Sequence, residues 1–208
     1  MDPRTVALLH CFLFAVLVQS APVSSPADPP PAFREAAERA KTLVEKILRD
    51  IPTVHSATIN TEGLSLDSSS QTTNLQMMVT SLGIPAPPVL KSLSDSFTLD
   101  MCVSRMLVGS QLHHGLLGVL SDKLSGLKDL RADLRDLQTH ITKMKEAAQL
   151  SSDVSDQNQI PDLASRLQGN YEVQVAGHVT LMQLRSFCHD LIRSLRAAIA
   201  YRRAGGKR

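Results

Sequence analysis

Three aspartates in the second half of the chain are candidates for binding a protein partner. Asp129, Asp133 and Asp136 stand at i, i+4 and i+7, a spacing that places side chains along one edge of a helix. Like charges at this spacing destabilise a helix by about 0.2–0.5 kcal/mol per pair, so a partner that supplies Arg or Lys would explain them. The alternative is an ordinary solvated helix face, because basic residues are interspersed with these aspartates.

Lys46 and Asp50 form a second charged pair, one helical turn apart in the first half of the chain. An ion pair within the helix and a contact to a partner are both compatible with this spacing. Charged contacts to a partner steer association more than they add affinity. Both residues are therefore candidates for a binding surface.

Motifs for catalysis, metal binding and nucleic-acid binding are not found in the sequence. His113 and His114 are adjacent and point in different directions on a helix, which makes them a poor pair of metal ligands. No Gly-rich phosphate loop and no GxSxG nucleophile motif is present. The net charge of +2 and the absence of Trp argue against nucleic-acid binding. We expect a protein that is not an enzyme and that has no cofactor and no metal site.

Residues 1–20 have the layout of a secretory signal peptide. Arg4 precedes an apolar run at 6–18, and small residues follow it. The run is too short to cross a bilayer comfortably, and no other stretch is apolar enough to do so. We expect cleavage after Ser20, with cleavage after Ala21 as the alternative. The mature protein would be secreted and would not insert into a membrane.

Cleavage would remove Cys11 and leave Cys102 and Cys188, which could form one disulfide in an oxidising compartment. If the helices that carry these two residues are antiparallel, a rise of 1.5 Å per residue separates them by roughly 10 Å along the helix axis. That separation exceeds the usual Cα distance in a disulfide. We expect two buried thiols.

Apolar residues recur at helical spacing in two long segments of the first 120 residues. The first segment is 32–51, and Pro52 is expected to end it. The second runs from about 97 to 120 and contains three glycines, each of which weakens a helix by up to about 1 kcal/mol relative to Ala. Packing must compensate for these glycines. A short helix at 74–82, ended by Gly83, is expected within the Ser- and Thr-rich connection between the two segments.

Two further long helices are expected after residue 120. The apolar residues at 127–144 alternate in steps of three and four, which is typical of a helix that packs on other helices. A last helix carries its apolar face at 181–198, and Gly169 and Gly177 both interrupt the approach to it. Between these two helices lies a polar connection that contains Pro161.

The order of the connections between the four long helices is long, short, long. A long connection can return the chain along a whole helix, so the first two helices can run parallel. The expected fold is therefore all-α, a four-helix bundle with up-up-down-down topology and two long crossover loops. The bundle would occupy 32–202, after a flexible leader at 21–31 and before a mobile basic tail at 203–208.

Several short motifs occur along the chain in a fairly specific order and spacing. One is the segment SLGIP at 81–85. The others are spread over the four long helices and the last connection: Val44, Lys46, Ile47, Asp50, Cys102, the run GLL at 115–117, Asp133, Asp136, Thr139, Ile141, Pro161, the pairs AS at 164–165 and SF at 186–187, Arg193, Leu195 and Arg196. Taken together, these motifs resemble the granulocyte colony-stimulating factor family, whose members belong to the interleukin-6 superfamily. The resemblance is best from residue 81 to the end of the chain.

The resemblance implies a secreted cytokine that binds and dimerises a class I cytokine receptor and so stimulates neutrophil production. It assigns receptor contacts on the third long helix to Asp133 and Asp136, and on the first to Lys46 and Asp50. A second receptor surface would use three residues of the short helix and the last connection: Asn74, Met77 and Leu167. Considered without the resemblance, Met77 and Leu167 would be core residues and Asn74 a helix cap.

The rival hypothesis is a secreted carrier of lipid, because strongly apolar helix faces also suit a lipid surface. Long connections and a narrow apolar seam favour the cytokine. The sequence therefore predicts a receptor-binding protein whose contacts are charged residues on the outside of a helical core.

Overall fold

The computed structural model describes residues 29–66, 73–150 and 162–201. Within these ranges the protein is all-α, as expected, and no strand is present. The helices are α2 (Pro31–Thr58), α3 (Thr73–Leu82), α4 (Leu99–Leu120), α5 (Lys128–Ala147), α6 (Leu163–Arg166) and α7 (Asn170–Ala200). The expected signal peptide, nearly all of the expected leader and the basic tail lie outside the described residues.

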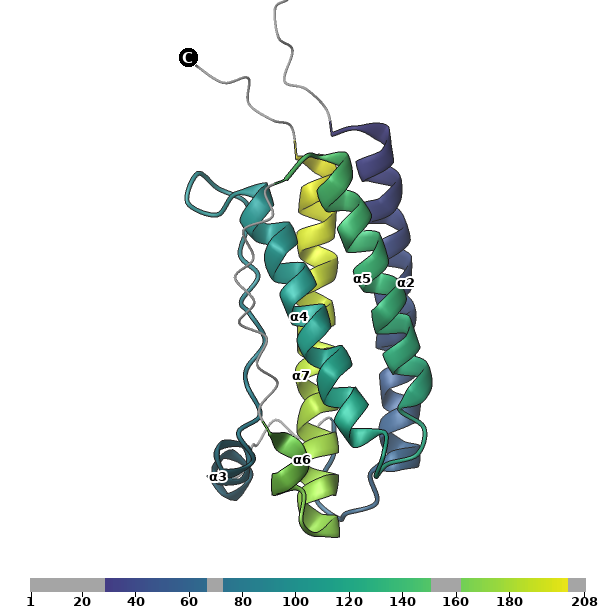
Figure 1. Cartoon of the computed structure of the whole chain (residues 1–208), viewed down its shortest axis with the longest axis vertical. Coiled ribbons are helices and arrows are strands. Elements are labelled where there is room, and N and C mark those ends of the chain that lie inside the picture. Colours follow the sequence, from purple (N-terminus) through teal and green to yellow (C-terminus); the bar gives the residue numbers. More distant parts are fainter. Residues whose placement is uncertain (1–28, 67–72, 151–161, 202–208) are drawn as a thin grey trace, which may run out of the picture. The chain divides into compact units, whose positions relative to one another are not determined.

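The four long helices α2, α4, α5 and α7 lie side by side (Figure 1). Helix α2 packs against α5 and α7, and α4 packs against the same two helices. The short helix α3 packs on α7, and α6 contacts α4. Each long helix therefore buries an apolar face against two others, and the core lies between them.

The largest fully buried side chains come from α2, α4, α5 and the turn before α5. They are Phe33, Ile47, Ile51, Met106, Leu116, Leu117, Leu120, Leu127, Leu130, Leu134, Leu137 and Ile141. The seam expected at 127–144 is buried throughout, including Met144. Two other apolar residues of the expected helix 32–51, Leu43 and Leu48, are half-buried and pack against the core from its edge.

Helix α2 continues for seven residues beyond the end expected at Ile51, and Pro52 lies inside it. Proline lacks the N–H that would bond to the preceding turn, and this usually ends or kinks a helix. Here Pro52 is on the exposed side, while His55, Thr58 and the following Ile59 are buried. Packing of this last part of α2 outweighs the missing hydrogen bond.

Helix α7 begins directly after Gly169 and runs through Gly177 without a break. A Cβ at Gly177 would lie 2.7 Å from a methyl carbon of Leu124 and 3.0 Å from one of Ile59. Glycine at this position therefore lets two neighbouring segments approach α7 closely. In the sequence Gly177 interrupts the approach to the last helix; in the structure it lies inside α7 and is a site of close packing.

Cys102 on α4 and Cys188 on α7 are free and fully buried, in agreement with the expected pair of thiols. Burial raises the pKa of Cys102 to about 11, although a hydrogen bond to Ser194 opposes this shift. Burial also raises the pKa of Cys188. Both groups therefore remain neutral thiols at physiological pH.

At Gly109 the backbone of α4 lies directly against a side chain of α7, and replacing this glycine tests that contact. A Cβ at this position would lie 2.4 Å from two ring carbons of Phe187, which also stacks on His113. We expect Gly109→Ala to lower the free energy of unfolding in urea by about 1–3 kcal/mol, because a packed aromatic ring would have to move.

Gly118→Ala in the same helix is the matched control. Its Cβ would lie 3.3 Å from the guanidinium of Arg131, which can move away. This variant should unfold at the same or higher urea concentration, with a gain of up to about 1 kcal/mol from the better helix propensity of Ala. Equal effects of the two substitutions would contradict a tight α4–α7 contact at Gly109.

Candidate functional site: the α2–α5 surface

A groove of about 700 Å³ lies between α2 and α5 on the outside of the protein. It is lined by Glu38, Arg39, Thr42, Leu43, Lys46, Arg49, Asp136, Thr139 and His140. A second hollow of about 500 Å³, between the start of α2 and the end of α5, shares Arg39 and His140 with it. We call the residues lining the larger groove, together with Asp50 and Asp133, the α2–α5 surface.

Lys46 is the centre of an ion-pair network that joins the two helices. Its ammonium group donates a hydrogen bond to the carboxylate of Asp133 on α5 and lies 3.3 Å from the carboxylate of Asp50 on α2. The hydrogen bond to Asp133 raises the pKa of Lys46, and Asp50 adds to this shift. The ion pair expected within α2 is therefore present, and the network extends to a residue 87 positions away in the sequence.

The three aspartates of α5 differ in how much a partner could reach them. Asp129 and Asp136 are exposed, and Asp136 lines the groove. The side chain of Asp133 is only 15% exposed and is paired with Lys46. Asp136 therefore presents an open carboxylate on this surface, whereas the charge of Asp133 is balanced from within the protein.

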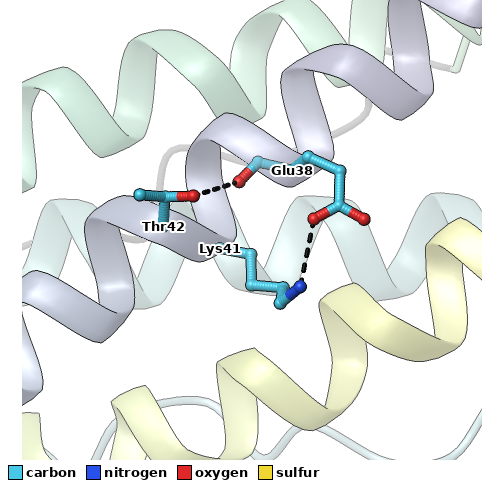
Figure 2. A network of polar contacts seen from close by, with 3 residues as sticks. All are labelled: Glu38, Lys41 and Thr42. Atoms are coloured by element: carbon cyan, nitrogen blue, oxygen red, sulfur yellow. Dashed lines mark hydrogen bonds and ion pairs between the residues drawn. The ribbon is translucent and has the colours of Figure 1, made fainter.

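Glu38 and Thr42, which line the same groove, make their hydrogen bonds within α2 (Figure 2). The hydroxyl of Thr42 donates to the backbone carbonyl of Glu38 at 3.1 Å, and Lys41 Nζ pairs with the Glu38 carboxylate, also at 3.1 Å. One further turn back, Arg39 pairs with Glu35 at 2.6 Å, and both side chains are more than half exposed. These contacts are all made within α2 and do not reach α5.

His140 lines both the groove and the neighbouring hollow. Burial lowers its pKa, the nearby cations Lys143 and Arg39 lower it further, and Asp136 opposes them. Its Nδ1 atom is buried and has no hydrogen-bond partner among the described residues. The ring is therefore neutral at pH 7 and offers a hydrogen-bonding atom that the described part of the protein leaves unmatched.

The residues of the second predicted receptor surface differ in exposure. Met77 on α3 is 60% exposed, and Asn74 is the second residue of that helix, with a side chain outside the described part. Leu167 is only 3% exposed, so a receptor contact through its side chain would require this part of the chain to move, and the contact stays a prediction. Leu167 directly follows α6, and its apolar side chain is part of the core. A hydrogen bond from Arg166 of α6 to the Ser81 carbonyl holds α6 near α3.

Sequence reasoning missed the groove residues that lie beside the selected charges, above all Arg39, Thr139 and His140. A signal was available in the spacing, because Thr139 and His140 follow Asp136 by three and four positions and so share its face of the helix. What could not be read was which polar face of α2 would lie next to that face of α5.

The described residues contain no cluster of three or more His, Cys, Asp or Glu side chains that could hold a metal ion. Nor does any described helix combine the length and apolar character needed to cross a membrane. Comparison with protein-family models and with curated protein sequences finds no match to this chain. A function for this protein is therefore supported by its sequence motifs and by the geometry of this surface.

Replacing Lys46 tests whether the network stabilises the α2–α5 pair. Lys46→Met keeps most of the side-chain volume but leaves the largely covered Asp133 carboxylate unpaired. We expect the free energy of unfolding to fall by about 0.5–1 kcal/mol, within the range for partly exposed ion pairs, and the loss to shrink in 1 M NaCl.

Arg39→Met is the control, because it breaks an ion pair that is exposed on both sides. Its free energy of unfolding should change by less than about 0.3 kcal/mol. Urea titrations of both variants at low and high salt provide the measurement. An effect of Lys46→Met no larger than that of Arg39→Met would show that the interhelical ion pair adds nothing to stability.

Proposed function

We propose that this protein is a secreted helical cytokine of the granulocyte colony-stimulating factor type, which binds and dimerises a class I cytokine receptor. The observation that carries the proposal is the α2–α5 surface. Four charged residues selected from the sequence, Lys46, Asp50, Asp133 and Asp136, come from helices far apart in the chain and meet on one side of the protein.

We further propose that the four long helices form an up-up-down-down bundle. The end of α2 meets the link after α4, where Thr58 donates to the Ser125 carbonyl at 3.1 Å, and this supports parallel α2 and α4. The side chain of Cys102, near the start of α4, forms a hydrogen bond with Ser194, near the end of α7, and this supports α7 running antiparallel to α4. Connections long enough for crossovers precede α4 and α7.

The contacts on the proposed receptor surface distinguish charges that join the two helices from charges that a receptor can reach. Lys46 and Asp133 hold α2 and α5 in register and are largely matched by each other. Asp136 and Arg49 are exposed beside them and present opposite charges to a partner. Such charges steer the approach of a complementary surface, and desolvated contacts at the centre of the groove supply affinity.

The rival proposal of a lipid carrier finds less support. Apolar side chains of all four long helices are buried against one another, so lipid binding would require this core to open. The large apolar side chains that are most exposed in the described residues are scattered: Met77, Val89, Met101 and Tyr171. Secretion itself rests on the signal-like sequence at 1–20.

The test is binding to the ectodomain of a receptor of the granulocyte colony-stimulating factor receptor type, measured by surface plasmon resonance. We expect Asp136→Ala to weaken binding by fivefold or more, about 1 kcal/mol, because an exposed carboxylate at the groove is removed. Asp122→Ala, at an exposed aspartate in the turn between α4 and α5, is the matched control and should bind as the unaltered protein does.

The double variant Asp133→Ala, Asp136→Ala should bind more weakly still, provided that its circular dichroism spectrum is unchanged. Unaltered receptor binding by the folded double variant would remove the α2–α5 surface as the binding site. Failure of the unaltered protein to bind the receptor at all would remove the proposed function.

A further inference from the structure

Two histidines meet in the interior at the junction of α2 and α7, away from the α2–α5 surface. The Nε2 atom of His55, in the last turn of α2, lies 2.9 Å from the Nδ1 atom of His178 on α7. The rings meet edge to face with centroids 5.2 Å apart, and the residues are 6% and 2% exposed. This hydrogen bond requires one ring nitrogen to donate and the other to accept, so at least one of the two facing nitrogens must be unprotonated.

Uncharged groups of the described residues make the contacts next to this junction. The Gln174 side chain accepts a hydrogen bond from the Asn60 N–H at 2.7 Å and donates one to the Thr58 carbonyl at 3.3 Å. It therefore pairs with backbone polar groups at and just after the end of α2. The side chains of Leu124, in the α4–α5 link, and Ile59, after α2, pack closely against α7 at Gly177. Three segments therefore pack together at this junction, and the described residues place no counter-ion that shifts the pKa of either ring.

Burial lowers the pKa of both histidines. The pKa of His178 falls to about 4, mainly because the ring is buried and in smaller part because of the positive charge that His55 would carry. Among the described residues no carboxylate, lysine or arginine contributes to the shift of either ring. Both rings are therefore neutral at pH 7. When the pH falls, no described charged group stabilises the protonated form of either ring.

We propose that the His55–His178 pair is an acid-sensitive latch, which holds the end of α2 on α7 at neutral pH and releases this junction when the surroundings are mildly acidic. A second proton on the pair removes the acceptor nitrogen, breaks the 2.9 Å hydrogen bond and places two like charges in an apolar junction. The release is local because the pair lies at one end of the α2–α7 contact.

The direction of the pH dependence follows from linkage between protonation and opening. An imidazole in the opened chain takes up a proton near pH 6.5, whereas the buried ring of His178 resists it down to about pH 4. The opened form therefore binds more protons as the pH falls below 6.5, and the stabilising effect of the neutral pair is lost between about pH 6.5 and pH 4. Above pH 7 the latch is closed and insensitive to pH.

The test uses a pair of substitutions that keep the hydrogen bond but cannot be protonated. The amide of Gln reaches the position of Nε2 and that of Asn the position of Nδ1, so the double variant is His55→Gln, His178→Asn. His189→Asn is the control, because this exposed histidine lies on the same helix. Urea unfolding of the three proteins is measured at pH 7.5 and pH 5.5.

For the unaltered protein and the His189 variant we expect the unfolding equilibrium constant to rise by at least about tenfold more over this pH range than for the double variant. The comparison removes the contribution of His113, another buried histidine with a pKa of about 4, because all three proteins retain it. An equal pH dependence in the double variant and the unaltered protein would overturn the proposal.

A measurement on the unaltered protein keeps the proposal testable should the double variant not fold. Amide hydrogen exchange, corrected for the intrinsic effect of pH, should accelerate at pH 5.5 in 54–58 and 173–180 before it does so in α5. Exchange that stays slow in both segments at pH 5.5, or that accelerates uniformly over all helices, would contradict a local latch.

Discussion

The burial of one apolar core between α2, α4, α5 and α7 is the constraint on which every other feature depends. Each of these helices contacts two of the others, so the position of any one is set by packing on both sides. One close approach is made at Gly109, where the ring of Phe187 occupies the space that a side chain would need. With 43% hydrophobic residues and no disulfide between Cys102 and Cys188, this packing is the main source of stability in the described part.

The charged α2–α5 surface is a consequence of that packing. Because Ile47 and Leu134 face the core, their neighbours Lys46 and Asp133 are brought to the rim of the helix pair, where they form an ion pair. The pair costs little to form at a partly exposed rim, and it reinforces the placement of α2 beside α5 that core packing sets. A partner would thus meet an arrangement of charges that is already in place, so that less entropy is lost on binding.

Much of this architecture could be predicted from the sequence, because helices and their buried faces depend on local spacing. The seam at 127–144 and the short helix ended by Gly83, which has a φ of +66°, are of this kind. What could not be predicted depends on distant neighbours. Pro52 fails to end α2 because tertiary packing outweighs its local preference.

The same limit applies to the functional residues. The row of aspartates on α5 could be read from its spacing, but not the selective covering of Asp133 by Lys46. The burial of Leu167 depends on tertiary packing, and His55 meets His178 across 123 positions, so one sequence holds no signal for either.

The most direct measurement is equilibrium unfolding followed by far-ultraviolet circular dichroism and by NMR signals of buried methyl groups. A tightly packed core predicts one cooperative transition with the same midpoint by both probes; gradual loss of helix, or helix gained on adding phospholipid vesicles, would contradict it.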